Sequence, residues 1–319
     1  MNVQIVVVNY RTAELTIDCL RSLEAEVRAN PGTRVVVTDN ASGDDSLARI
    51  EAAIARCGWT GWVELMPLAR NGGFAYGNNA AIRAALAHTP AVDSILLLNP
   101  DTIVRPGALA ALARVLDSDP KIGIVGSRLE DPDGRAQRSS FRFPSLLGDL
   151  EDALQFGLAT RLLARWCVAP PQVDRLAITD WVAGACMLVR REVFEQIGLL
   201  DEAYFMYYEE VDFCRRSRAA GWLCAYEPTS RVVHLVGQAS GVTDRSLRRR
   251  RPAYWFESRR TYFLRHHGGP YTLGTDLAWS IGYFLWRCRR WLQGKEDRDP
   301  PKLLVDFLRH STLLRGFST

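Results

Sequence analysis

The sequence lacks long hydrophobic runs, cysteine pairs and a secretion signal. None of its apolar stretches reaches the roughly 18 residues that a membrane-spanning helix requires. The apolar run at residues 5–8 is short and has no basic region before it, so we expect no signal peptide. The seven cysteines form no CxxC pair and no regular framework, which argues against a zinc site and against secretion. We therefore expect a cytoplasmic protein.

The chain also lacks the Walker motif of P-loop NTPases, and no activated serine or cysteine nucleophile is evident. Among its 319 residues, 47% are apolar and 24% are charged, which is the balance of a globular protein with a sizeable core. This length fits one large α/β domain, or one domain with an appendage.

Charge is distributed unevenly along the chain. Residues 245–319 hold 16 lysines and arginines against 6 acidic residues, a net charge of +10, which leaves −6 for the preceding 244 residues. A basic, aromatic-rich tail on an acidic body indicates an anionic surface as partner, and both membrane headgroups and nucleic acid qualify.

Short β-branched or aliphatic runs alternate with helical patterns in the first 125 residues. Strands are predicted at residues 4–8, 34–38, 63–66 and 94–98, with helices between them, including residues 80–87. This alternation predicts βαβ units, and therefore an α/β fold with a mainly parallel central sheet flanked by helices.

The pattern loosens after residue 123. Residues 131–175 are expected to form a mobile connecting region with short helices around residues 146–163. Beyond it we predict one strand at residues 180–189, helices at 192–197 and 209–218, and closing strands at 223–226 and 231–234.

Polar residues follow three of the predicted strands. They are Asn9, Tyr10 and Arg11; Asp39 and Asn40; and Asn99 and Asp101. Ligands of open α/β sheets bind at the carboxyl ends of the strands, so these loops define one candidate site. Each loop taken alone could be a plain turn.

Two further segments could bind a phosphorylated ligand with its cation. Asn71, Gly72, Gly73 and Phe74 form a Gly-rich loop that opens a helix, where backbone N–H groups can approach a phosphate. Asp101 follows a buried strand, where its carboxylate could hold Mg²⁺ or Mn²⁺ against a diphosphate. The alternatives are a plain turn for the loop and a helix N-cap for Asp101.

Three carboxylates, Glu209, Glu210 and Asp212, lie beside aromatic residues at a predicted helix start. A carboxylate near apolar rings is a candidate general base, although acidic residues in a first helical turn also complement the helix dipole. His234 ends an apolar strand, and a lone histidine there is more often a core residue than a ligand.

These segments, in this order, resemble family 2 inverting glycosyltransferases of the GT-A fold, in particular the rhamnosyltransferase-like branch. The resemblance covers roughly residues 1–240 and is carried by residues 7–10, 37–42, 71–74, 98–101, 184–185 and 207–212. It implies a glycosyltransferase domain at 1–240, with a nucleotide-binding half at about 1–125 and an acceptor half at about 126–240. A basic helical extension follows at 241–319.

The resemblance also implies roles for individual residues. Asp39 would hold the nucleotide base, beside Asn9, Tyr10 and Arg11. The donor pocket would be lined by Asn71, Gly72, Gly73 and Phe74, and Asn99 and Asp101 occupy the place of the family's Asp-X-Asp motif, with Asn99 replacing its first aspartate.

On the acceptor side, the resemblance makes Glu210 the catalytic base, a Glu where Asp is commoner in the family. His234 would join Asp101 around Mg²⁺ or Mn²⁺. Acceptor-side or supporting roles fall to Trp181, Gly184, Ala185, Glu209 and Asp212. This assignment is chemically consistent, because inversion needs one carboxylate to take the acceptor proton and a cation to neutralise the departing diphosphate.

The implied donor is a dTDP- or UDP-linked sugar, with dTDP-rhamnose favoured. The implied acceptor is a glycan or a lipid-linked molecule in cell-envelope synthesis. Residues 277–291 mix aromatic and basic residues at helical spacing, which favours a helix at the inner face of the plasma membrane. A packing or oligomerisation helix is the second interpretation, and nucleic acid is not expected.

Two rival functions remain open at this point. A sugar nucleotidyltransferase shares a similar sheet and metal, but usually carries a Gly-rich loop after its first strand, whereas residues 9–12 hold no glycine. A non-catalytic nucleotide- or carbohydrate-binding module would need neither Glu210 nor metal ligands.

Overall fold

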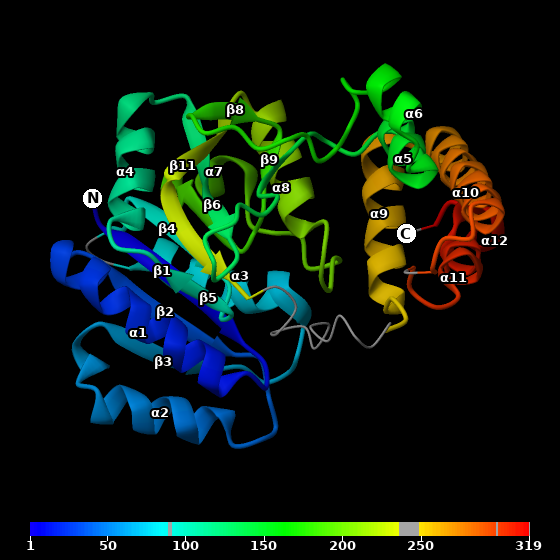
Figure 1. Ribbon diagram of the computed structural model, residues 1–319. Helices are drawn as coiled ribbons and strands as arrows, with labels where there is room; N and C mark the ends of the chain where they lie inside the picture. Colours follow the sequence, from blue (N-terminus) through cyan, green and yellow to red (C-terminus); the bar gives the residue numbers. More distant parts are fainter. Residues whose placement is uncertain (89–90, 236–248, 298, 319) are drawn as a thin grey trace. The chain divides into compact units, whose positions relative to one another are not determined.

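The computed structural model describes residues 1–88, 91–235, 249–297 and 299–318 (Figure 1). The chain divides into two compact units. The sheet unit comprises Met1–Ser140, Pro171–Phe205 and Glu209–Thr243, and the helical unit comprises Phe141–Pro170, Met206–Tyr208 and Asp244–Thr319. The helical unit therefore includes two segments from within residues 1–240, which the sequence had assigned to the first domain.

Within the described residues, the sheet unit contains a nine-stranded sheet in the order β3-β2-β1-β4-β10-β6-β11-β5, with β8 paired to β11. The strands are β1 (Val3–Asn9), β2 (Arg34–Asp39), β3 (Val63–Pro67), β4 (Ser94–Leu98), β5 (Thr102–Val104), β6 (Ile122–Glu130), β8 (Ala177–Thr179), β10 (Cys186–Arg190) and β11 (Leu223–His234). β3, β2, β1 and β4 are parallel, as predicted, whereas β10 runs antiparallel to both of its neighbours, β4 and β6.

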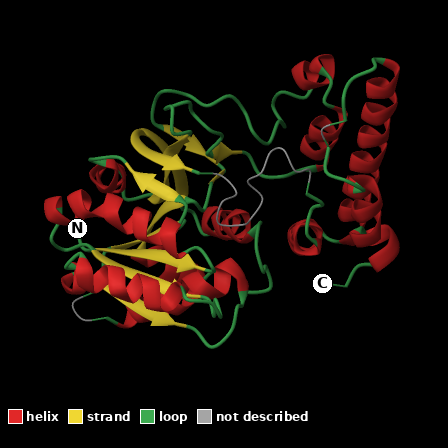
Figure 2. Ribbon diagram, turned by 60° about the horizontal axis from the view of Figure 1, so that its bottom comes forward, coloured by secondary structure: helices red, strands yellow, loops and turns green. Residues whose placement is uncertain are grey.

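Helices cover both faces of this sheet, as Figure 2 also shows. Val3, Ile5 and Val7 of β1 join the main core. The helices packed there are α1 (Ala13–Ala29), α2 (Ser46–Arg56) and α4 (Ala108–Ser118), and a short 3-10 turn (Trp59–Gly61) adds Trp59. Val8 points the opposite way, toward Gly77. That face carries α3 (Gly73–Ala87), α7 (Arg191–Ile197) and α8 (Glu209–Ala219). The period-two alternation of a strand explains why one apolar run serves two cores.

Two strand predictions need correction. The single strand expected at 180–189 is split into β9 (Trp181–Val182), which pairs with β7 (Ser140–Phe141), and β10, with residues 183–185 between them. The two closing strands are one strand, β11, whose pairing with β6 shifts register between Glu227 and Arg231. A local irregularity of this kind bends a strand without ending it.

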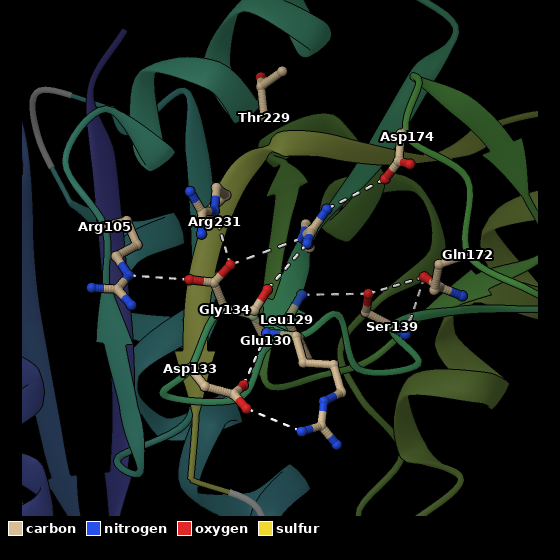
Figure 3. A network of polar contacts seen from close by, with 12 residues as sticks. Arg105, Leu129, Glu130, Asp133, Gly134, Ser139, Gln172, Asp174, Thr229 and Arg231 are labelled. Atoms are coloured by element: carbon tan, nitrogen blue, oxygen red, sulfur yellow. Dashed lines mark hydrogen bonds and ion pairs between the residues drawn. The ribbon is translucent and has the colours of Figure 1, made fainter.

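A buried carboxylate holds β5, β6 and β11 together (Figure 3). Glu130, at the end of β6 and fully buried, accepts hydrogen bonds from Arg105 Nε (3.1 Å) and Arg231 Nε (2.8 Å). Burial opposes ionisation, but the hydrogen bonds from Arg231 and Arg105 outweigh it and lower the pKa of Glu130. Since Arg105 follows β5 and Arg231 lies in β11, this network stabilises the pairing of these two strands.

The helical unit consists of α5 (Leu146–Leu154), α6 (Gly157–Leu162), α9 (Ala253–His267), α10 (Gly269–Leu292), α11 (Leu303–His310) and α12 (Thr312–Arg315). α5 and α6 fall where short helices were predicted. Its core includes Phe256, Trp279 and Phe307, with the last two rings stacked at 3.9 Å. Arg259 is buried between Asp149 and Asp276 and donates hydrogen bonds to both. This ion network ties α9 to α5 and α10.

Candidate active site

The strand directions bring the predicted polar residues to one edge of the sheet. β2, β1 and β4 are adjacent and parallel, so Asp39, Asn9 and Asn99 meet at their carboxyl ends. β10 runs antiparallel to β4, so Ala185 lies at that edge too, and its carbonyl accepts a hydrogen bond from the Asn99 backbone N–H at 2.9 Å. β6 runs antiparallel to β10, and β11 runs parallel to β6, so β11 has the same direction as β4. His234, the last residue of β11, therefore lies at the same edge of the sheet.

Asp39 lies at the centre of a hydrogen-bond cluster with Asn9 and Ser42. Its Oδ1 accepts from Asn9 Nδ2 (2.7 Å) and Ser42 Oγ (2.6 Å), and its Oδ2 accepts from the Ser42 backbone N–H (3.1 Å). Arg11 has a φ of 57° and donates from its backbone N–H to Ser42 Oγ. Tyr10 is 37% exposed at this edge. A carboxylate has about four acceptor positions, so Asp39 retains one for a ligand.

The Gly-rich loop folds against the neighbouring strand end. Asn40 Nδ2 donates to Asn71 Oδ1 and to the Gly73 carbonyl, both at 3.0 Å, and Asn71 Oδ1 also accepts from the Gly73 N–H. Gly73 has a φ of +87°, and a Cβ there would overlap the Phe205 backbone. Gly72 precedes the first turn of α3. The loop therefore requires glycine at Gly73 and presents a helix N-terminus, as a diphosphate site needs.

Asp101 and His234 face each other. Asp101 Oδ1 lies 3.5 Å from His234 Nε2, because β5 pairs Thr102 with His234 and the Leu235 N–H donates to the Asp101 carbonyl. Two ligands of one octahedral cation lie about 3 Å apart, so the pair fits Mg²⁺ or Mn²⁺ after a small adjustment. Among the described residues, no three His, Cys, Asp or Glu side chains gather as a metal site. Phosphate oxygens and water would have to complete the shell.

The acidic pair opens α8 in a buried environment. Glu209 is buried and Glu210 partly buried, and one carboxylate oxygen of each, Oε2, has no hydrogen-bond partner within the described chain. Burial raises the pKa of Glu210 to about 7. Burial and the neighbouring charge of Glu210 raise the pKa of Glu209 well above its ordinary value. Glu210 therefore has the proton affinity of a general base near neutral pH.

Glu210 lies beside two other predicted site residues. A Cβ built on Gly184 would lie 3.6 Å from both the Glu210 Cβ and the Phe74 ring, so the three residues surround one small space. Asp212 instead turns away to Arg216, whose Nε donates to it at 2.7 Å. Trp181 lies on β9, three residues before Gly184. Glu210 therefore lies next to Phe74 of the Gly-rich loop, whereas Asp212 is paired with Arg216.

Residue patterns did not single out two contributors to this site, Ser42 and Phe205. Ser42 Oγ binds both Asp39 and Asn9, and the run of turn-forming residues at 39–43 is the signal that could have marked it. Phe205 accepts a hydrogen bond from the Phe74 backbone N–H at 2.8 Å, and no sequence pattern marked it.

Comparison with known proteins identifies the family. The family model described as "Glycosyltransferase like family 2" matches residues 2–254. The chain is a family 2 glycosyltransferase. It is 34% identical over 217 residues to the N-acetylglucosaminyl-diphospho-decaprenol L-rhamnosyltransferase of Mycobacterium tuberculosis, covering 65% of this chain and 68% of that one. It is 29% identical over 164 residues to the rhamnosyltransferase WbbL of Escherichia coli, covering 51% of this chain and 60% of that one.

Solved structures match the fold of this glycosyltransferase over nearly its whole length. The mannosyltransferase PcManGT from Pyrobaculum calidifontis, solved with GDP-Man and Mn²⁺, aligns with a TM-score of 0.59 at 15% identity, covering 99% of this chain and 84% of that one. TarS 1-349 of S. aureus, solved with UDP-GlcNAc, aligns with a TM-score of 0.55 at 13% identity, covering 98% and 82%. The GT-A fold and the family resemblance expected from the motifs are confirmed.

Proposed function

We propose that this glycosyltransferase transfers a sugar from a nucleotide-diphosphate donor to an acceptor hydroxyl, with inversion, using Glu210 as the base. The observation that supports this proposal most strongly is the position of Glu210 beside Gly184 and Phe74. At this position its pKa is about 7, and its Oε2 has no hydrogen-bond partner among the described residues. The carboxylate takes the acceptor proton as the acceptor oxygen attacks opposite the leaving diphosphate.

The residues at the strand ends would bind the donor. The remaining acceptor position of Asp39 suits the imide N–H of a pyrimidine base, with Asn9 holding the carboxylate in place and Tyr10 and Arg11 beside it. The loop from Asn71 to Phe74 lies under the diphosphate, and Asn99 supports it from the end of β4. Asp101 and His234 would hold Mg²⁺ or Mn²⁺, which when bound neutralises charge on the departing diphosphate.

Relatives suggest the donor and the acceptor. Two of them are named as rhamnosyltransferases, and one of these carries an N-acetylglucosaminyl-diphospho-decaprenol acceptor in its name. We therefore favour dTDP-rhamnose as donor and a lipid-linked diphosphate sugar as acceptor in cell-envelope glycan synthesis. Family membership favours sugar transfer over a nucleotidyltransferase or a non-catalytic binding module.

A membrane surface is the proposed partner of the helical unit, at the inner face of the plasma membrane. No helix in the described part of the chain is long and apolar enough to cross a bilayer. One face of α10 nevertheless exposes large apolar side chains at helical spacing: Leu277, Ile281, Phe284, Leu285, Trp291 and Leu292, with Trp291 80% exposed. Such a face in a segment of net charge +10 suits an anionic bilayer interface.

The structure corrects the expected make-up of this helix. Trp279 and Tyr283 do not belong to the exposed face, because both are buried in the helical core. Arg287 and Arg290 pair with Asp297 rather than forming a free basic rim. The arginines at positions 245 and 248 lie outside the described residues.

Liposome sedimentation tests the membrane proposal. Replacing Phe284, Leu285 and Trp291 together by Ser should abolish binding to anionic liposomes, while the control pair Leu176→Ser and Ile178→Ser, also exposed, should not. If the wild-type protein ignores liposomes but binds single-stranded DNA with a steep salt dependence, nucleic acid is the partner. Loss of an oligomer in the triple variant instead would assign the face to self-association.

Calorimetry tests the donor site. We expect dTDP-rhamnose to bind in Mn²⁺ or Mg²⁺ and to lose affinity in excess EDTA or in Asp101→Ala, while the exposed control Asp174→Ala binds normally. Full transfer activity in excess EDTA would contradict the metal. Tight binding of UDP-GlcNAc without binding of dTDP-rhamnose would overturn the donor preference.

A further inference from the structure

A cavity of about 410 Å³ lies within the helical unit, at the start of α9. Its lining consists of residues 250–253 and Phe256, together with Asp306 and His310 of α11. Figure 1 shows α11 beside the first turns of α9. All of these residues belong to the helical unit. The volume is in the range of small-molecule sites, about 300–1,000 Å³, so the cavity is large enough for a ligand.

Arg251 is the lining residue with the least satisfied charge. Within the described chain its guanidinium lies over the Trp255 ring, 4.1 Å from the ring centroid, and makes no hydrogen bond or ion pair. Burial lowers the pKa of Arg251, so desolvation outweighs the attraction of the nearby Asp152 carboxylate. A guanidinium removed from water is costly unless an acceptor pairs with it. Arg251 therefore has its whole fork of donors available for an anion that enters the cavity.

The neighbouring arginine is already paired. Arg250 Nε and Nη2 both donate to the buried Asp306 carboxylate, in the first turn of α11. This pairing lowers the pKa of Asp306, which therefore stays ionised. Burial lowers the pKa of His310, so its imidazole adds no charge at neutral pH. Among the described lining residues, two guanidinium groups thus stand against one carboxylate, and the surplus charge of +1 belongs to Arg251.

The start of α9 adds backbone donors to the same cavity. Pro252 is the N-cap residue, and the first turn of α9 contains no acidic side chain. Pro252 and Ala253 both line the cavity. The N–H groups of a first helical turn favour a negatively charged ligand. The helix end and the Arg251 fork therefore favour the same kind of ligand.

These donors suit a phosphate group. A guanidinium fork binds two phosphate oxygens at once, and a phosphate has a further oxygen for the helix end or for Arg250. A carboxylate has two oxygens and a single charge, so it would leave some of these donors without a partner. Arg250 is half exposed, so the cavity opens to solvent on its side.

We propose that the start of α9 and the facing side of α11 form a phosphate-binding site, in which Arg251 pairs with the phosphate. Two molecules of the proposed function carry this group: an anionic membrane lipid, in its headgroup, and the lipid-linked acceptor, in its diphosphate. Only this choice of source rests on the proposed function. The site itself rests on Arg251, its cavity and the end of α9, all within the helical unit.

Calorimetric titration with inorganic pyrophosphate tests the site. EDTA is present throughout, so that Asp101 and His234 hold no cation during the titration. We expect the wild-type protein to bind pyrophosphate, and Arg251→Gln to bind it about 10–100-fold more weakly, the usual loss for charge-assisted hydrogen bonds. Arg251→Lys keeps the charge without the planar fork, so its affinity should lie between the two.

Arg165→Gln is the matched control. Arg165 belongs to the same unit, is exposed, and also lies over a tryptophan ring, 3.7 Å from the centroid of Trp166, but it does not line the cavity. The substitution removes the same charge from the same unit. We therefore expect Arg165→Gln to bind pyrophosphate as tightly as the wild-type protein.

Thermal melting separates binding from a structural role. Without phosphate, Arg251→Gln should melt no more than about 4 °C below wild type, because removal of a desolvated charge offsets the lost contact with Trp255. Pyrophosphate should raise the Tm of the wild-type protein and of Arg165→Gln, but not that of Arg251→Gln.

Vesicle sedimentation distinguishes the two sources of phosphate. If a lipid headgroup supplies it, Arg251→Gln should bind phosphatidylglycerol vesicles several-fold more weakly than Arg165→Gln does. If the acceptor diphosphate supplies it, the two variants should bind these vesicles equally, while Arg251→Gln still loses pyrophosphate.

Three results would overturn the site. They are a wild-type protein that does not bind pyrophosphate, equal losses of affinity in Arg251→Gln and Arg165→Gln, and an Arg251→Gln variant that binds normally. A much lower Tm of Arg251→Gln without phosphate would make Arg251 a structural residue instead. Full activity of Glu210→Gln would contradict the proposed function and leave the pyrophosphate result unchanged.

Discussion

The two acidic sites of the sheet unit differ in how their oxygens are satisfied. Asp39 accepts three hydrogen bonds from Asn9 and Ser42, so that both of its oxygens have a partner. Glu209 and Glu210 each keep a buried oxygen without a partner in the described residues, and burial raises the pKa of both. Both sites are acidic groups at the ends of secondary-structure elements.

The difference in hydrogen bonding suits Asp39 to ligand binding and Glu210 to proton transfer. A carboxylate held by several donors stays ionised and fixed, which suits recognition of a ligand N–H. A desolvated carboxylate with a free oxygen has a high proton affinity, which suits a general base but opposes stability. We therefore expect opposite responses to amide substitution at the two sites.

The largest effect is expected at Glu210. Glu210→Gln should lower kcat by about 10²–10⁴-fold while leaving donor affinity unchanged, because the base acts in the transition state. Glu209→Gln and Asp212→Asn are matched controls that should lose less turnover, and Asp212→Asn should instead lose stability through its bond to Arg216. Transfer rates and calorimetry on folded protein decide this. A dead but folded Asp212→Asn beside an active Glu210→Gln would move the base by two residues.

The pH dependence of kcat/KM gives the next largest effect. Since the pKa of Glu210 in the free enzyme is about 7, kcat/KM should fall roughly tenfold per pH unit below that value and level off above it. Steady-state rates at donor and acceptor concentrations below KM measure the profile. An unchanged rate at about pH 5 would exclude Glu210 as the titrating base.

Asp39→Asn should act on binding rather than turnover. Its amide nitrogen would face the Ser42 N–H, two donors without an acceptor, so we expect the free energy of unfolding to fall by about 1–3 kcal/mol. Donor affinity should fall about tenfold with kcat nearly unchanged. Asp45→Asn, at an exposed carboxylate nearby, is the control. If Asp39→Asn lowered kcat and left donor affinity unchanged, Asp39 would not be a binding residue distinct from the catalytic Glu210.

The smallest effect concerns stability against pH. The folded pKa of Glu209 and Glu210 lies above the ordinary value of 4.5, so the folded state binds more protons and stability falls as pH rises from about 4.5 through 7. The Tm of Glu210→Gln relative to wild type should therefore increase between about pH 5 and pH 8. Glu51→Gln, on the exposed surface of α2, should show no such trend.

Sequence patterns predicted the sheet edge well because its signals are local. β-branched runs followed by Asn9, Asp39 and Asn99 predict both the strands and the side of the sheet where their ends meet. The pairing of Asp101 with His234 was suggested by family resemblance, but its geometry depends on the long-range pairing of β5 with β11 and on Glu130.

The helical unit was harder to predict because its contacts are distant in sequence. Residues 141–170 and 206–208 join helices that lie far along the chain, and periodicity carries no information about such partners. Apolar spacing on α10 could not show which aromatic residues, such as Trp279, turn into the core. Left-handed backbone at Tyr207 and Tyr208 opposes local propensity and is visible in the structure alone.

The central claim is that one carboxylate, Glu210, drives a single displacement at the sugar carbon. The most direct test is the anomeric configuration of the transferred sugar, measured by NMR on the product of the wild-type enzyme with dTDP-rhamnose or whichever donor binds. A single displacement at this carbon gives a configuration opposite to that of the donor. Retention of the donor configuration would contradict it.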